Sequence, residues 1–217
     1  CYTDFYEKML IVEKKFKKDK INSVRLELGS GVGFFKKYDD TIITSDVVKN
    51  KFTDRVLDAN NLPYNKNDIS TIFGIFCFHH FKDPFNFLKD LESKLKEGGL
   101  CILAEPYYGP LAKILYKKVH DSEYFDDSEK FNIKIENKTA MEKANQALSY
   151  IYFIKNKDEF EKNFPQLEII YTYVFHNYLR FLFSGGLNFR KLIPDFFLYF
   201  IKFFEIILAP FKKLFGI

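Results

Sequence analysis

The sequence predicts an α/β fold in which a mostly parallel sheet is covered by helices on both faces. Two observations carry this prediction. A glycine-rich turn follows an apolar run near the N-terminus, and β-branched or aromatic runs then alternate with segments of helical periodicity. The chain has 217 residues, 47% of them hydrophobic, which is enough to bury the core of one domain. We therefore expect residues 1–217 to form a single domain.

The glycine-rich turn is the most informative segment. The expected strand 24–28 leads into glycines at positions 29, 31 and 33, and Glu27 stands two residues before the first of them. Glycine lets the backbone approach a ligand closely and lets the next helix, expected to begin at Gly33, pack against the strand. The spacing differs from the G-x-G-x-x-G of dinucleotide folds, and no Lys-Ser or Lys-Thr pair follows as in a phosphate-binding loop. The turn therefore predicts a nucleotide-type site that does not hold a triphosphate.

The segments that follow continue the same series. Residues 41–46 read as a second strand ending in Asp46, which lies 17 residues after Gly29. An acid at an offset of about 20 residues suits the hydroxyls of a ribose. Residues 56–64 then include Asp58 and Ala59, and residues 69–78 read as a fully buried strand. A helix is expected over residues 85–96, ended by Glu97-Gly98-Gly99, and a fifth strand over residues 100–106.

The ordered motifs of residues 20–106 resemble those of class I S-adenosylmethionine-dependent methyltransferases, in particular the methyltransferase type 11 group. The resemblance implies a three-layer Rossmann-like methyltransferase fold, S-adenosylmethionine as the cofactor, and an enzyme that transfers a methyl group. It places the methionine part of the cofactor on the glycine turn, the ribose on Asp46 and the adenine on Asp58 and Ala59. The cofactor-binding residues that it implies are Glu27, Gly29, Ser30, Gly31, Gly33, Asp46, Asp58 and Ala59. The ordinary alternatives are that Asp46 caps a helix and that Asp58 is a turn acid.

Methyl transfer to a hydroxyl needs a base, and a histidine or a carboxylate is the usual one. His80 follows the expected strand 69–78, with a loop-ordering role as the alternative, whereas its neighbour His79 is expected to point away. His120 stands next to Asp121 in the variable region, and Glu105 ends the fifth strand. Glu105 could instead order the loop. The candidate catalytic residues are therefore His80, His120 and Glu105.

Composition and residue spacing disfavour several other functional classes. The formal net charge is +4, but only four of the 33 basic residues are arginine, which disfavours nucleic-acid binding. No C-x-x-C or H-x-x-x-H spacing occurs, so no metal site is expected, and Cys77 and Cys101 fall within strands as ordinary core residues. No signal peptide is visible. We expect a cytoplasmic protein with a small-molecule acceptor as its partner and no nucleic acid.

The remainder of the chain departs from the common core. Residues 107–166 read as an insertion on the acceptor side, and residues 167–217 as a sixth strand (167–175) followed by a Phe-rich helical tail. The helix expected from Pro194 to Ala209 is shorter than the ~20 residues that cross a membrane. We expect it to pack on the sheet or over the site. The alternative is peripheral membrane contact or self-association through residues 195–209, with Lys212 and Lys213 facing lipid headgroups.

These observations favour a methyltransferase that acts on a small molecule, with an oxygen of a sugar, a lipid-linked glycan or a secondary metabolite as the acceptor. A non-catalytic cofactor-binding or scaffolding protein, whose C-terminal helix binds a partner or a membrane, is the alternative. A nucleic-acid methyltransferase is disfavoured, because Phe78-His79-His80-Phe81 stands where an Asn/Asp-Pro-Pro-aromatic signature is expected.

Overall fold

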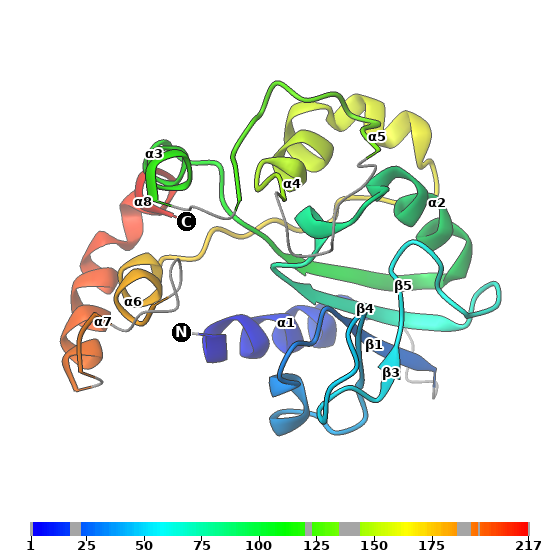
Figure 1. The fold of residues 1–217 in the computed structure, drawn as a ribbon, viewed down its shortest axis with the longest axis horizontal. Helices are drawn as coiled ribbons and strands as arrows, with labels where there is room; N and C mark the ends of the chain where they lie inside the picture. Colours follow the sequence, from blue (N-terminus) through cyan, green and yellow to red (C-terminus); the bar gives the residue numbers. More distant parts are fainter. Residues whose placement is uncertain are drawn as a thin grey trace.

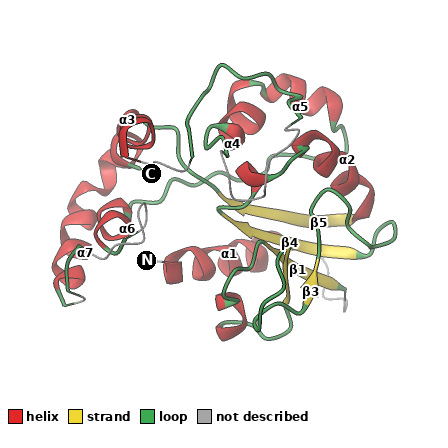
Figure 2. Ribbon diagram, in the orientation of Figure 1, coloured by secondary structure: helices red, strands yellow, loops and turns green. Residues whose placement is uncertain are grey.

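A computed structural model describes residues 2–17, 23–119, 123–134, 144–185, 192–194 and 196–216. Its centre is a sheet of five strands in the order β3-β2-β1-β4-β5, and every pair of neighbours is parallel (Figure 2). The strands are β1 (Val24–Leu28), β2 (Ile43–Asp46), β3 (Arg55–Val56), β4 (Ile69–Ile75) and β5 (Leu95–Ala104). The parallel α/β architecture is thus the predicted one.

Helices lie on both faces of this sheet. Figure 1 shows α1 on one face and α2, α4 and α5 on the other. The longer helices are α1 (Tyr2–Phe16), α2 (Pro84–Lys94), α3 (Pro110–Val119) and α7 (Phe197–Leu208). The shorter ones are α4 (Leu148–Tyr150), α5 (Lys157–Asn163), α6 (Tyr178–Phe183) and α8 (Lys212–Phe215). Other helical turns form η1 (Phe34–Lys37) between β1 and β2, η2 (Phe78–His80) between β4 and α2, η3 (Ile151–Lys155, a π-helix) between α4 and α5, and η4 (Ala209–Phe211) between α7 and α8.

The central strands β1 and β4 form the buried core of the sheet, as their apolar sequences predict. All residues of β4 except Ile75 are buried, as expected for a parallel strand that is covered on both faces. Leu26 of β1 pairs with Ile72 of β4, and both side chains are fully buried. Phe73 contacts Phe35 of η1 at a centroid distance of 4.7 Å. Burial on both faces fixes the register, and with it the place where each strand ends.

A partly buried ion-pair network joins α1 to the start of β1. The guanidinium of Arg25 donates to Glu13 on α1 at 2.9 Å (Nε) and 2.5 Å (Nη2), and to Asp39 at 2.5 Å. Thr71 of β4 donates its hydroxyl to Glu13 at 2.7 Å. The pKa of Glu13 is below its ordinary value: burial alone would raise it, but Arg25 and Thr71 outweigh burial.

Two local elements differ from the sequence prediction. The helix expected at Gly33 is only the 3₁₀ turn η1, because the chain turns back at Tyr38 and Asp39 to enter β2. The expected fifth strand begins earlier, at Leu95, so Glu97-Gly98-Gly99 does not precede it. These residues lie inside β5 in a bulge: Leu95 pairs with Ile69, yet Leu100 pairs with Thr71.

The predicted sixth strand, residues 167–175, is wrong: this segment is extended but pairs with no strand among the described residues. Its alternating aromatic side chains lie along α1 instead. Phe175 meets Phe5 edge-to-face at 4.5 Å, and Lys8 lies 4.2 Å from the ring centroid of Tyr173. Alternation of side chains suits an extended segment on a helix surface as well as a strand in a sheet.

The C-terminal helix does not pack on the sheet as expected. α7 packs against α6, on the far side of the molecule from β3 (Figure 1). Its buried residue is Glu205, which forms an ion pair with Arg180 of α6 at 2.5 Å, whereas most of its Phe side chains are exposed. Within the described part of the chain, no helix is long and apolar enough to cross a bilayer.

Candidate functional site

The glycine turn at the carboxyl end of β1 has the backbone geometry that only glycine adopts easily. Gly29, Gly31 and Gly33 have φ values of +65°, +50° and +64°. A Cβ atom on Gly29 would lie 2.7 Å from the Cβ of Cys77, whereas a Cβ on Gly31 would have no described atom within 4 Å. The turn is therefore packed against the protein at Gly29 and open at Gly31.

Asp46, at the end of β2, holds this turn in place. One carboxylate oxygen accepts the N–H of Gly31 at 3.0 Å, and the other accepts the N–H of Val48 at 3.0 Å. Asn50 closes the turn from the other side by donating to the carbonyl of Gly31 at 2.8 Å. A carboxylate has about four acceptor positions. Asp46 can therefore order the turn and still accept hydroxyl donors.

Glu27 and Ser30 are buried beside the turn. Oε2 of Glu27 and Oγ of Ser30 have no hydrogen-bond partner within the described residues. Burial, with a smaller effect from the charge of Asp46, raises the pKa of Glu27 from 4.5 to about 8. Buried polar atoms without partners are costly, and a ligand that bonded to them would relieve that cost. The amino and carboxyl groups of a methionine moiety are of the right chemistry for these two side chains, so the residues present fit S-adenosylmethionine.

The third predicted cofactor segment forms a turn. Oδ1 of the exposed Asp58 accepts the N–H of Asn60 at 2.9 Å, and Ala59 is buried. The ordering role that was the alternative for Asp58 is thus present in the structure. Adenine contact by Asp58 and Ala59 stays a prediction.

Glu105, directly after β5, orders the turn η2 that follows β4. Its carboxylate accepts the N–H groups of Cys77 and Phe78 at 2.9 Å each and of His79 at 3.3 Å, and it contacts Nδ1 of His79 at 2.6 Å. Glu105 thus makes the loop-ordering contacts that were its alternative role, and its role as a catalytic base stays a prediction.

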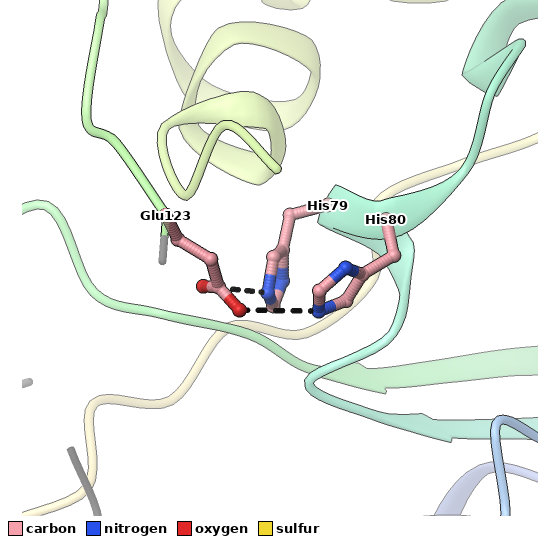
Figure 3. Close-up of side chains that lie close together, drawn as sticks. All are labelled: His79, His80 and Glu123. Atoms are coloured by element: carbon pink, nitrogen blue, oxygen red, sulfur yellow. Dashed lines mark ion pairs between the residues drawn. The ribbon is translucent and has the colours of Figure 1, made fainter. Parts of the chain in front are cut away.

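Both histidines of η2 face one carboxylate, Glu123, which comes from the region between α3 and α4 (Figure 3). Nε2 of His79 lies 3.5 Å from Oε2 of Glu123, and Nε2 of His80 lies 3.4 Å from Oε1. The expectation that His79 points away is wrong, because η2 is a 3₁₀ turn and its neighbouring side chains do not alternate as in a strand. His79 is almost fully buried, and His80 is partly exposed.

The charges of this cluster are strongly coupled. Burial lowers the pKa of His79, but Glu105 and Glu123 outweigh it and raise the pKa to about 9. Burial raises the pKa of Glu123, but its hydrogen bond to His79 outweighs it and lowers the pKa to about 2. Gln146 also donates to Glu123, at 2.6 Å. Both shifts favour the charged forms of His79 and Glu123, and His80 lies at the exposed edge of the cluster.

The glycine turn and the histidine cluster adjoin each other through Cys77. This residue contacts Gly29 and is followed at once by η2. Burial, and then the charges of Glu105, Cys101, Glu27 and Asp46, raise the pKa of its thiol well above the ordinary value. Both halves of the site thus lie at the carboxyl ends of β1, β2, β4 and β5, the edge of a parallel sheet at which ligands bind.

The side chains of His79, His80 and Glu123 could together hold a metal ion. Ligand atoms of His79, His80 and Glu123 lie within 4.8 Å of one another, and histidine with carboxylate is a ligand set of zinc. The sequence analysis searched for metal ligands at short, fixed spacings. It could not find this set of ligands, because Glu123 lies far along the chain from His79 and His80. The predicted candidate His120 lies outside the described residues.

Besides His79, the sequence analysis missed Glu123 and Gln146 as residues of this cluster. Both lie in the region assigned to the acceptor side, 107–166, and a hydrogen-bonded bridge between Tyr124 and Asn145 brings them together. The only local signal is the acidic run around Glu123, which is equally typical of a solvated loop.

Comparison with protein families identifies the core. Residues 26–103 match the model of a family described as "Methyltransferase domain". This match confirms the predicted resemblance. It covers a little over a third of the chain, from β1 to the end of β5, and includes both η2 and the glycine turn. No curated protein matches the sequence.

Several solved structures resemble the same core. They include a complex between the Haloferax volcanii Trm112 methyltransferase activator and the putative methyltransferase (16% identity, TM-score 0.32, alignment over 47% of this chain and 57% of that one). Another is the YcgJ protein of Bacillus subtilis (18% identity, TM-score 0.38, alignment over 50% of this chain and 56% of that one). A third is a SAM-dependent methyltransferase of Aquifex aeolicus (24% identity, TM-score 0.33, alignment over 42% of this chain and 58% of that one). The chain thus spans just over half the length of these proteins, and likeness at this level does not extend to their activities.

Proposed function

We propose that this protein is an S-adenosylmethionine-dependent methyltransferase that methylates an oxygen of a small molecule. The observation that carries the proposal is the contact between Gly29 and Cys77, which sets a cofactor-type glycine turn beside a histidine–carboxylate cluster. The family match over residues 26–103 supports the choice of cofactor. When bound, S-adenosylmethionine supplies an activated methyl group, so the protein has to align the acceptor and accept its proton.

The cluster supports a division of roles. His80 is the candidate base because it lies at the exposed edge of the cluster, 3.4 Å from Glu123, which can hold the imidazolium that forms. Glu105 and His79 position η2 and Glu123. A hydroxyl acceptor needs such a base, and this requirement favours oxygen. The contribution of Glu123 and Gln146 supports an acceptor side built by residues 107–166.

A sugar, a lipid-linked glycan or a secondary metabolite is the proposed acceptor, and the cytoplasm the proposed compartment. A non-catalytic scaffolding protein is the second candidate, favoured by the exposed Phe side chains of α7, which offer a surface for a partner. The two differ in turnover: a scaffolding protein binds the cofactor but transfers no methyl group to any acceptor.

The test is transfer of labelled methyl groups from S-adenosylmethionine to panels of glycans, lipid-linked sugars and hydroxylated metabolites. We expect His80→Ala and Glu123→Gln to lower turnover about 100-fold or more, with cofactor affinity unchanged. His176→Ala is the matched control, because this histidine lies before α6 and outside the cluster. Loss of turnover on chelation, restored by zinc, would assign the cluster to a metal instead of a base. A folded chain that binds no cofactor would contradict the proposal.

A further inference from the structure

The helix α7 has its apolar face turned toward solvent. Side chains spaced three and four residues apart form this aromatic face of α7, which comprises Phe197, Tyr199, Phe200, Phe203, Phe204 and Ile207. Their exposed fractions run from 46% for Phe197 to 80% for Tyr199. In soluble proteins an amphipathic helix turns such a face inward, and a large apolar patch is rarely left in water. We therefore expect the aromatic face of α7 to be covered by another apolar surface.

The orientation of α7 is fixed by its one carboxylate. Glu205 is fully buried and accepts from both the backbone N–H (2.8 Å) and Nε (2.5 Å) of Arg180 on α6. Arg180 also forms an ion pair with Asp4 of α1 at 2.9 Å. Burying this bonded pair compels the opposite side of the helix, which is aromatic, to face outward. The outward face is thus a consequence of α7 docking on α6 through Glu205.

We propose that the aromatic face of α7 docks on an anionic membrane surface and lies in the plane of the interface. Lys202 on α7 and Lys213 on α8 (Lys212–Phe215) are exposed, and residues 196–216 contain no acid other than the buried Glu205. Aromatic side chains on one face with flanking lysines are typical of interfacial helices. Lysines near the surface add attraction to anionic lipids.

The charges distinguish a membrane from a second copy of this chain. A two-fold contact through the aromatic face would add the positive charges of Lys202 and Lys213 from both copies at one interface. The same segment offers no exposed carboxylate to pair with them. Unpaired like charges at an interface are unfavourable, whereas anionic headgroups neutralise these lysines.

The place of the helix is consistent with an acceptor held at a membrane. The tail packs against the loop that follows β5: a Cβ on Gly109 would lie 2.9 Å from the backbone oxygen of Lys213. Gly109 is four residues from Glu105, which orders the histidine cluster. Figure 1 shows α7 and α8 on the side toward which β5 runs. Among the proposed acceptors, this placement favours the lipid-linked glycan. Docking itself does not rest on the proposed function, because it is measured without cofactor.

The experiment is flotation of the full chain with vesicles of phosphatidylcholine alone and with vesicles that also contain phosphatidylglycerol. We expect binding to the anionic vesicles that weakens with salt and is at least about tenfold weaker on the neutral ones. The double variant Phe200→Ser/Phe203→Ser should lower partitioning about 100-fold, roughly tenfold for each ring withdrawn from the interface. The matched control Ile11→Ser/Ile170→Ser removes two exposed apolar side chains elsewhere and should bind as wild type.

Three results would overturn the inference. The first is no binding to anionic vesicles by the folded wild-type chain, and the second is equal binding by the Phe variant. The third is a dimer in sedimentation velocity that the Phe variant abolishes, since it would assign the aromatic face to a second copy. Thermal melting of each variant shows that the fold is kept. A chain that transfers methyl groups but does not bind anionic vesicles would overturn membrane docking and leave the proposed function standing.

Discussion

Replacing Gly29 and Gly31 separately by alanine tests how the glycine turn is built. Both positions have positive φ, so an alanine at either one costs about 1–2 kcal/mol of backbone strain. At Gly29 the new Cβ also lies 2.7 Å from the Cβ of Cys77, far inside the ~3.5 Å of an ordinary carbon contact. Overpacking of that kind costs about 1–3 kcal/mol more. Gly29→Ala should therefore lower the free energy of unfolding by about 2–5 kcal/mol, and Gly31→Ala by about 1–2 kcal/mol.

Urea unfolding measures these differences, and a double-mutant cycle assigns them. In a Cys77→Gly background the partner atom of the clash is absent. The extra cost of Gly29→Ala should then fall by about 1–3 kcal/mol. The cost of Gly31→Ala should not change. Equal losses at the two glycines, or no coupling between Gly29 and Cys77, would refute the packing argument. Calorimetry adds a second contrast: Gly31→Ala should keep the fold but obstruct the cofactor, because its Cβ points into open space.

Three further variants test charges that the fold buries. The pKa of Glu27 is raised to about 8, so its contribution to stability is complete below its ordinary pKa and is lost as the pH rises through 8. Glu27→Gln should therefore be more stable than wild type near pH 9 but not near pH 4 in urea unfolding. Arg25→Ala leaves the buried Glu13 without its main partner and should cost about 3–5 kcal/mol, measured in the same way. Glu205→Ala leaves Arg180 without its buried partner and should undock α7, which faster hydrogen exchange over residues 197–208 would reveal.

Structural features that depend only on a short stretch of sequence were predictable. The run into Gly29 and the strand that ends at Asp46 are each visible within a few residues, because an apolar run and a glycine turn have their own sequence patterns. The order of these motifs along the chain then places them at one edge of a parallel sheet. The family resemblance was predictable for the same reason.

Features that depend on a distant partner were not predictable. Glu123 reaches the histidines only because the region after α3 folds back over η2. Residues 167–175 alternate as a strand does, but the partner of an extended segment is not encoded in its own period. The face of α7 was assigned inward because it is apolar, and Arg180 reverses that assignment by offering Glu205 a buried partner.

The most direct test of the central claim is calorimetric titration of the chain with S-adenosylmethionine and with its demethylated product. The same titration is repeated on Asp46→Ala. The account predicts micromolar binding of both ligands by wild type and a loss of at least about tenfold in the variant, since the carboxylate holds the turn and offers acceptors for the ribose. A folded wild-type chain that binds neither ligand would contradict the account. So would an Asp46→Ala variant that binds them as tightly as wild type.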